Sequence, residues 1–369
     1  MPQILEVKMT DKITGKEYIL RYNHPIPNTF GIKANACVYG EYHSEKGLCE
    51  LLDIHKNEYI HLPILHTGDG SNLLFLDNYH GMVIRSAIRT IDKLRIQDDE
   101  ILVRVGGGVN FDDFVAQAVR QGWYGLENLS LIPGQVGACA VQNIGAYGVE
   151  AKDVIYKVEG ISFADGSSHS WTITECDYDY RQSIFKKQLK GKYAITYVTF
   201  RLQNKFKPRL AYRGIMRAIT QAGYNAEKLT AEQLREVIIN VRREKLPDPN
   251  EQGSAGSFFM NPIISRSAFI ALSSLYPTMP HYDVNLEQVK IPAGWLIEQC
   301  GWKGRALGEA AVHHNQALVL VNRGNATGSE ILQLSNAIRH DVLQKFGIVL
   351  QPEVNFIGCL SSESEKCQQ

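Results

Sequence analysis

The sequence lacks an excess of charge of either sign and any long apolar run. Its 369 residues carry 39 Lys and Arg against 39 Asp and Glu, a formal net charge of zero. A dedicated nucleic-acid binder usually carries a basic excess, so this class is not expected. No apolar stretch approaches the ~20 residues that cross a bilayer, and the start lacks the apolar core of a signal peptide. These absences predict a soluble, cytoplasmic protein with no nucleic-acid or membrane partner.

Closely spaced cysteine pairs are also absent. The seven cysteines include no C-x-x-C pair, and their number is odd. Structural zinc sites and disulfide frameworks need regular cysteine spacing, so neither is expected. The adjacent His313 and His314 would face opposite sides of a strand, which argues against a metal pair. The sequence therefore predicts no metal site.

The composition is that of a globular protein, at 44% hydrophobic and 21% charged residues. The length predicts two or three domains, and the basic, proline-containing residues 205–208 suggest a boundary. Helices are expected after Asn110, from the capping box of Thr230 and Gln233 up to residue 244, and over 329–347. Buried strands are expected at 64–65, 73–76, 82–84, 101–105, 154–158, 193–202 and 317–321. Strands and helices follow no regular βαβ rhythm, so the fold class is α+β.

Three glycine-rich stretches mark the first half of the chain, at residues 68–72, 106–108 and 133–148. Glycine permits positive φ and lets backbone N–H groups approach a ligand, which suits a pyrophosphate. Each loop taken alone is better explained as a tight turn, but three in one domain favour a phosphate-bearing cofactor. None has the G-x-G-x-x-G pattern of the Rossmann fold or the G-x-x-x-x-G-K-[ST] phosphate-binding loop of nucleoside triphosphatases. The residues therefore indicate a dinucleotide cofactor in a fold of another kind.

Ten short runs, in order along the chain, resemble one family. They lie at residues 28–32, 68–72, 125–134, 142–150, 180–185, 245–249, 255–262, 293–300, 310–313 and 351–354. In these runs the sequence resembles the UDP-N-acetylenolpyruvoylglucosamine reductases, of the longer type with a tyrosine that closes over substrate. The resemblance implies non-covalent FAD, NADPH as co-substrate, and reduction of an enolpyruvyl nucleotide sugar to UDP-N-acetylmuramate for peptidoglycan synthesis.

The resemblance also implies an architecture. The FAD-binding domain would be of the vanillyl-alcohol-oxidase (PCMH) type and span residues 24–205. An α+β substrate-binding domain would span 206–350. The terminal segments 1–23 and 351–369 would pack on the FAD domain, the second bringing Glu353 to the active site. A monomer is expected.

Three residues match the catalytic positions of the family. Arg181 is a permanently charged planar group suited to a carboxylate. Ser257, among small residues, matches the proton donor to the enolpyruvyl carbon. Glu353 would act beside the substrate carboxylate, where desolvation would raise its pKa. A serine hydrolase is not indicated, because Ser257 lies outside a G-x-S-x-G elbow.

The remaining site residues are also assigned by the resemblance. Those expected to bind the cofactor are Gly68, Asp69, Gly70, Ser71, Asn72, Gly134, Gly137, Ala138, Asn143, Ile144, Gly145 and Ala146. Those expected to bind substrate are Tyr147, Tyr212, Lys245, Asn261, Tyr282 and Gln316. The sequence departs from the family pattern at residues 138–140 and at Asn355, which puts one charged contact in doubt.

Two alternatives stay open from the sequence. The first is a flavin-dependent oxidase of an alcohol or sugar on the same fold, with His66 as the candidate for a covalent flavin link. The second is a nucleotide-sugar-binding protein without catalysis, whose glycine loops are turns. The reductase and the oxidase would both show flavin absorbance, whereas the binding protein without catalysis would not.

Overall fold

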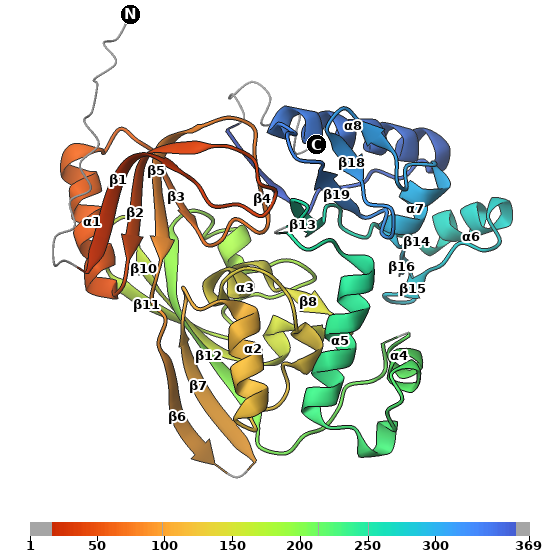
Figure 1. The fold of residues 1–369 in the computed structure, drawn as a ribbon, viewed down its shortest axis with the longest axis horizontal. Coiled ribbons are helices and arrows are strands. Elements are labelled where there is room, and N and C mark those ends of the chain that lie inside the picture. The colour runs from red at the N-terminus through yellow and green to blue at the C-terminus, as the bar shows by residue number, and fades with distance from the viewer. Residues whose placement is uncertain (1–16, 98, 213, 250, 359–369) are drawn as a thin grey trace, which may run out of the picture. The chain divides into compact units, whose positions relative to one another are not determined.

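Figure 1 shows the protein as a computed structural model that describes residues 17–358, apart from 98, 213 and 250. The described chain forms two compact units, each built from separate stretches. The first contains the residues up to Ile26, Asn35–Asp69 and His80–Arg242. The second contains Pro27–Ala34, Gly70–Tyr79 and the residues from Arg243 onward. The domain limits expected from the sequence stay a prediction, and parts of both terminal segments lie outside the described residues.

The first sheet of the first unit has the strand order β1–β2–β5–β3. β1 (Tyr18–Pro25) and β2 (Asn35–Tyr42) pair antiparallel, whereas β3 (Ile64–Thr67) and β5 (Tyr79–Ser86) pair parallel. Helix α1 (Glu45–Glu58) begins after Ser44, whose side chain accepts the N–H of Gly47. Its buried leucines recur at helical spacing and pack with Met82 and Ile84 of β5. This helix therefore covers one face of the sheet.

The second sheet of the first unit is five-stranded and antiparallel. Its order is β11 (Ser168–Thr172), β10 (Ile155–Ser162), β12 (Tyr193–Gln203), β7 (Glu100–Gly106) and β6 (Ile91–Gln97). Helix α2 (Phe111–Arg120) packs on it, with the Phe114 and Phe200 ring centroids 4.9 Å apart. The side chain of Asn110 accepts the N–H of Asp113 at 3.1 Å, which confirms the predicted start of this helix.

Shorter elements complete the first unit. Helix α3 (Val136–Gln142) is followed by the hairpin of β8 (Gly145–Ala146) and β9 (Val149–Glu150). The 3₁₀ turns are η1 (Glu127–Leu129), η2 (Ala151–Asp153), η3 (Ile184–Lys186) and η4 (Ala226–Lys228). Helices α4 (Ile215–Gln221) and α5 (Ala231–Lys245) follow, and α5 belongs to the first unit up to Arg242. The predicted capping box before α5 is confirmed, because Thr230 and Gln233 exchange backbone-to-side-chain hydrogen bonds. The helix continues one residue further than predicted and includes Lys245.

The second unit contains three small sheets. One has the order β13 (Ser254–Ser257), β19 (Val319–Asn322), β18 (Ala310–Val312) and β17 (Ala306–Leu307). Another has the order β14 (Ile263–Ser265), β16 (Gln288–Lys290) and β15 (Tyr282–Asp283). In the third, β4 (Leu73–Phe75) pairs parallel with β20 (Asn355–Ile357).

Three helices accompany these sheets. They are α6 (Arg266–Leu275), α7 (Ala293–Gln299) and α8 (Gly328–Phe346). Thr327 and Glu330 form a capping box at the start of α8, and Gly347 ends it with φ +66°. This agrees with the helix predicted over 329–347. None of the helices in the described part of the chain is both long and apolar enough to span a bilayer. The mixture of sheets and helices confirms the α+β class.

Candidate active site

Arg181 occupies a strained turn of the first unit. Its φ of +55° is in the left-handed region, which is unfavourable for a residue with a side chain by about 1–3 kcal/mol. The guanidinium donates from Nη2 to the carbonyl of Gly145 at 2.6 Å and from Nη1 to that of Asn143 at 3.3 Å. These bonds aim the cation at the residues just after α3. The catalytic residue expected from the sequence therefore lies against the expected cofactor loop.

The side chain of Asn143, a residue expected to bind the cofactor, is engaged in hydrogen bonds within the protein. It is buried and left-handed, with φ +45°. Its Nδ2 donates to the carbonyl of Asp179 at 2.8 Å and to Glu150 at 3.0 Å, and its Oδ1 accepts the N–H of Lys152. The side chain therefore joins three segments of the protein, and the backbone is engaged as well, because its N–H donates to the carbonyl of Cys139 and its carbonyl accepts from Arg181.

The glycines of this loop serve close packing. Gly134 has φ +105°, and the N–H of Gly137 donates to the carbonyl of Gly107 at 3.0 Å. A Cβ on Gly145 would lie 2.9 Å from Nη1 of Arg181 and 2.9 Å from the carbonyl oxygen of Val149. Of the neighbouring residues, Ala138 is exposed, and Ile144 and Ala146 are half-buried. Any side chain at position 145 would displace the Arg181 guanidinium.

The first glycine loop is divided between the units. Gly68 and Asp69 belong to the first unit, where Asp69 accepts a hydrogen bond from Arg85 at 2.5 Å. Gly70, Ser71 and Asn72 belong to the second unit. Gly70 has φ +66°, and a Cβ there would come within 2.4 Å of the carbonyl oxygen of Pro27. Glycine is thus required at this turn by both its conformation and its neighbour.

The backbone of these glycine loops is open to a ligand, as binding of a flavin dinucleotide requires. Positive-φ glycines and small residues keep the chain at Gly70, Gly134 and Ala138 free of large side chains, so backbone groups can approach a pyrophosphate. Gly137 adds no free N–H, since its own is used by Gly107. The residues present therefore fit a cofactor held mainly through backbone contacts.

Ser257 ends β13, and Glu353 lies two residues before β20, in a segment joined to the one after Ser257 by the backbone bridge of Phe259 and Pro352. The N–H of Glu353 donates to the carbonyl of Phe258 at 2.8 Å, directly after Ser257. The register of β13 shifts between Ser254 and Ser257, and Gly256 between them has φ +68°. Such an irregularity re-aims side chains, and Ser257 is exposed. Two expected catalytic residues, 96 positions apart in the sequence numbering, are thus brought together by backbone pairing.

Asn72 fixes Glu353 in this arrangement. Its Nδ2 donates to the carbonyl of Glu353 at 3.1 Å, and its own carbonyl accepts the N–H of Asn355 at 3.0 Å. Glu353 is half-buried, next to the buried Val354. The expected cofactor residue and the expected catalytic carboxylate therefore both lie just before the paired strands β4 and β20.

Two expected substrate residues meet at the start of α7. Oδ1 of Asn261 accepts the N–H of Ala293 at 2.9 Å, and Oε1 of Gln316 lies 3.0 Å from where a Cβ of Gly294 would be. Two residues after Gln316, the carbonyl of Leu318 accepts the N–H of Phe258. The structure thus places Asn261 and Gln316 close in the fold to the Ser257 strand.

The other two expected substrate residues of this unit are exposed. Lys245 is the last residue of α5, and Tyr282 in β15 has 45% of its surface exposed. The carbonyl of Glu244 accepts a hydrogen bond from Asn315, the residue before Gln316. This bond connects the end of α5 to the Gln316 loop, whereas Tyr282 pairs with Lys290 of β16.

In the first unit, Tyr147 and Tyr212 form a pair of rings. Their centroids are 5.4 Å apart and the rings are nearly perpendicular. Tyr147 has φ +49°, and burial raises its pKa while Arg242, which hydrogen-bonds to it, lowers it. The sequence analysis missed Arg242. Its Nε is buried with no hydrogen-bond partner among the described residues, so this guanidinium has unused donor capacity. Its position three residues before Lys245, one turn of α5, could have indicated it.

His66, the candidate for a covalent flavin link, has a different environment. Its Nε2 lies 2.8 Å from the Tyr42 hydroxyl, and its ring contacts those of Tyr42 and Phe163. Burial lowers the pKa of His66 to about 4. The residue is therefore a neutral member of an aromatic cluster.

This histidine predicts a pH dependence of stability. Above pH ~6.5 the side chain is neutral in both states, and below that the unfolded chain takes up the proton first. The free energy of unfolding should therefore decrease as the pH falls from about 6.5 towards 4, by up to about 1.4 kcal/mol for each unit of pKa shift. Urea unfolding at a series of pH values measures it. His66→Gln should flatten this part of the profile, and an unchanged slope would contradict the assignment.

The structure corrects the argument made for His313 and His314. Strand β18 ends at Val312, so the two residues do not alternate across a strand, and their ring centroids are only 4.4 Å apart. Over the described residues, no group of three or more His, Cys, Asp or Glu side chains could hold a metal ion.

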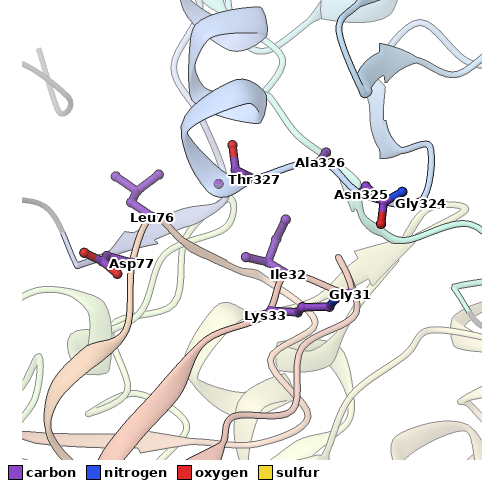
Figure 2. Close-up of a pocket in the computed structure, with 10 residues that line it drawn as sticks. Gly31, Ile32, Lys33, Leu76, Asp77, Gly324, Asn325, Ala326 and Thr327 are labelled. Carbon is purple, nitrogen blue, oxygen red and sulfur yellow. The ribbon is translucent and has the colours of Figure 1, made fainter.

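A cavity of about 260 Å³ lies at the start of α8 in the second unit (Figure 2). Its lining includes Ile32, Lys33, Leu76, Asp77 and Thr327. None of the residues expected to act in catalysis or binding lines it. The cavity is therefore separate from the candidate active site.

Comparisons with known proteins decide the family. A family model of the FAD binding domain matches residues 42–171, and one described as the UDP-N-acetylenolpyruvoylglucosamine reductase C-terminal domain matches 248–357. The UDP-N-acetylenolpyruvoylglucosamine reductase of Bacteroides fragilis is 51% identical over 330 residues, covering 89% of this chain and 97% of that protein. The chain belongs to the UDP-N-acetylenolpyruvoylglucosamine reductase family. It is therefore an FAD-dependent oxidoreductase, as the resemblance implied.

Further relatives agree with this family. The Porphyromonas gingivalis reductase is 44% identical over 341 residues, covering 92% of this chain and 99% of that protein. The solved structure of the Thermus caldophilus reductase matches with a TM-score of 0.62 at 24% identity, over 90% of this chain and 96% of that one. The structure of 6-hydroxy-D-nicotine oxidase from Arthrobacter nicotinovorans matches with a TM-score of 0.51 at 11% identity. The match covers 95% of this chain and 88% of that one. These two structures confirm the predicted fold class.

Proposed function

We propose that the protein transfers a hydride from NADPH to the enolpyruvyl ether of a UDP-N-acetylglucosamine derivative, giving UDP-N-acetylmuramate. The observation that carries this proposal is the pairing of the Ser257 and Glu353 segments, because it joins a hydroxyl and a carboxylate that the reaction needs. Bound FAD would supply the hydride transfer between NADPH and the substrate. The cofactor would be held by the residues of loops 68–72 and 134–146.

Reduction of the enolpyruvyl group needs two additions at neighbouring carbons. A hydride added to the methylene carbon leaves negative charge on the next carbon and on the attached carboxylate. Ser257 would then deliver its Oγ proton to that second carbon, which bears the ether oxygen. The exposed position of Ser257, turned outward at the irregularity of β13, leaves its hydroxyl accessible for this step.

Charge on the substrate carboxylate would be stabilised by Arg181 and Glu353. Arg181 is a fixed cation whose orientation is set by two carbonyl groups. A donor that is already oriented loses little free energy to reorganisation when charge develops nearby. Glu353 would contribute a hydrogen bond to the same carboxylate through a shared proton.

The diphosphate and sugar would be bound by charged and aromatic groups. Lys245 and the partly unsatisfied guanidinium of Arg242 would provide positive charge for the phosphates. Tyr147 and Tyr212 would pack against the nucleotide or close over it. Asn261, Tyr282 and Gln316 would contribute polar contacts. The expectations of a monomer and of a cytoplasmic location stay predictions.

Mixing experiments test this function. The purified protein is reduced anaerobically with NADPH, and bleaching of its flavin absorbance is followed. The enolpyruvyl nucleotide sugar should then restore the absorbance, and UDP-N-acetylmuramate should form in equal amount. Failure of this substrate to reoxidise the flavin would overturn the proposal. Release of the flavin by acid precipitation checks that the cofactor is non-covalent.

The same mixture examines the oxidase alternative. An oxidase would consume oxygen when given an alcohol or sugar and would need no NADPH. The contacts of His66 with Tyr42 and Phe163 offer no support for a flavin linked through this residue. Oxygen uptake with simple sugars and no response to the enolpyruvyl compound would favour the oxidase.

A further inference from the structure

The loop that carries Arg181 is attached to the end of α3 by a set of side-chain hydrogen bonds. Besides the two from Arg181 itself, Oγ of the buried Ser183 donates to the carbonyl of Val141 at 2.7 Å. Nδ2 of Asn143 donates to the carbonyl of Asp179 at 2.8 Å. Each of these bonds joins one residue of the loop to one residue near the end of α3. They locate the loop, and the Gln182 N–H donates to the Asp179 carbonyl at 3.0 Å, but none of these bonds holds the carbonyl of the peptide that follows Arg181.

Lys186 restrains that peptide. Its Nζ donates to the backbone carbonyl of Arg181 at 3.0 Å and to Oε1 of Gln142, the last residue of α3, also at 3.0 Å. One ammonium group therefore connects the left-handed residue to the helix end. Hydrogen bonds from a charged donor are stronger than neutral ones, and this one is half-buried, where water competes less.

We propose that Lys186 is a positioning residue for Arg181. By holding the Arg181 carbonyl it keeps the backbone at φ +55°, the conformation from which the guanidinium reaches the carbonyls of Asn143 and Gly145. Without the ammonium the residue would relax to negative φ, and the same side chain would point elsewhere. The proposal rests on the proposed function of Arg181 at the substrate carboxylate.

The next residue provides a matched control. Lys187 has the same side chain but is exposed, and its Nζ pairs with Asp177 at 3.0 Å instead of contacting Arg181 or α3. Exposed ion pairs contribute little to stability. Removing the Lys187 ammonium changes net charge by the same amount as removing that of Lys186, but leaves the Arg181 carbonyl bond in place.

The test compares Lys186→Met, Lys186→Arg and Lys187→Met in the flavin-loaded protein. In Lys186→Met, reoxidation of reduced flavin by the enolpyruvyl substrate should slow by about tenfold to a hundredfold. The rate of flavin reduction by NADPH should stay within about twofold of wild type. Lys186→Arg should recover most of the rate, and Lys187→Met should match wild type. Equal slowing of both half-reactions in Lys186→Met, or slowing in Lys187→Met, would overturn the proposal.

A second measurement is independent of activity. Amide hydrogen exchange over residues 179–184 should become faster in Lys186→Met and not in Lys187→Met, because the loop loses its restraint. Unchanged exchange in Lys186→Met would also count against a positioning role.

Arg181→Met separates this proposal from the proposed function. If Arg181→Met slows reoxidation and Lys186→Met adds nothing further in that background, the two residues act together. If Arg181→Met is slow but Lys186→Met is normal, only the positioning role is wrong. Normal reoxidation by Arg181→Met would overturn both.

Discussion

Replacement of Ser257 by alanine should slow turnover by about a hundredfold to ten-thousandfold, the usual contribution of a positioned proton donor. NADPH should still reduce the flavin in this variant, because Ser257 takes no part in that step. The enolpyruvyl substrate should then reoxidise the flavin only slowly. Stopped-flow absorbance of the two half-reactions measures both rates, and normal reoxidation would refute the assignment of Ser257.

Ser254 on the same strand is the matched control. It is buried, whereas Ser257 is exposed, and its backbone N–H donates to the carbonyl of Thr29. Alanine keeps that backbone bond, so Ser254→Ala should retain near-normal half-reactions. A comparable loss in both variants would indicate damage to β13, not removal of a proton donor.

Gly145→Ala should reduce substrate-dependent reoxidation by a factor of about a hundred or more, although it adds only a methyl group. That methyl would come within 2.9 Å of both Nη1 of Arg181 and the rigid carbonyl oxygen of Val149. The backbone cannot yield easily, so the guanidinium must move, and small displacements of a catalytic group cost about this much. The rate of NADPH-dependent flavin reduction and the reoxidation rate are measured separately, together with the thermal midpoint.

Coupling to Arg181 identifies the cause of this loss. If the methyl acts by moving the guanidinium, Gly145→Ala should have almost no effect in an Arg181→Met background. If the double variant instead loses the product of the two single-variant factors, the methyl acts on something other than Arg181. A wild-type reoxidation rate in Gly145→Ala alone would show that the loop accommodates the methyl without moving the guanidinium.

Local signals in the sequence predicted much of the fold. The N-cap at Asn110 and the capping box at Thr230 depend on side chains within a few residues of the helix start, and both are present. The sequence could not indicate the parallel pairing of β4 with β20, because that contact depends on residues far apart in the chain. The division into two discontinuous units has the same origin.

The candidate site was predicted less completely. The resemblance assigned Asn143 to the cofactor, but its side chain is used by Asp179, Glu150 and Lys152, partners that no motif identifies. The left-handed backbone of Arg181 could not be predicted from the sequence either, because residues other than glycine adopt this conformation only where surrounding contacts require it. The position of Arg242 one helical turn before Lys245 could have indicated it, but its burial and its Nε without a partner among the described residues are seen only in three dimensions.

The pairing of β4 with β20 bears on how the chain folds during synthesis. Asn72 and Glu353, which are hydrogen-bonded beside these strands, are 281 positions apart. At a typical elongation rate of about 5–20 residues per second, β4 leaves the ribosome many seconds before its partner exists. The second unit thus cannot close around residues 70–79 until late in translation. Until then these residues, including the apolar Leu74 and Phe75, are available to chaperones and to neighbouring chains.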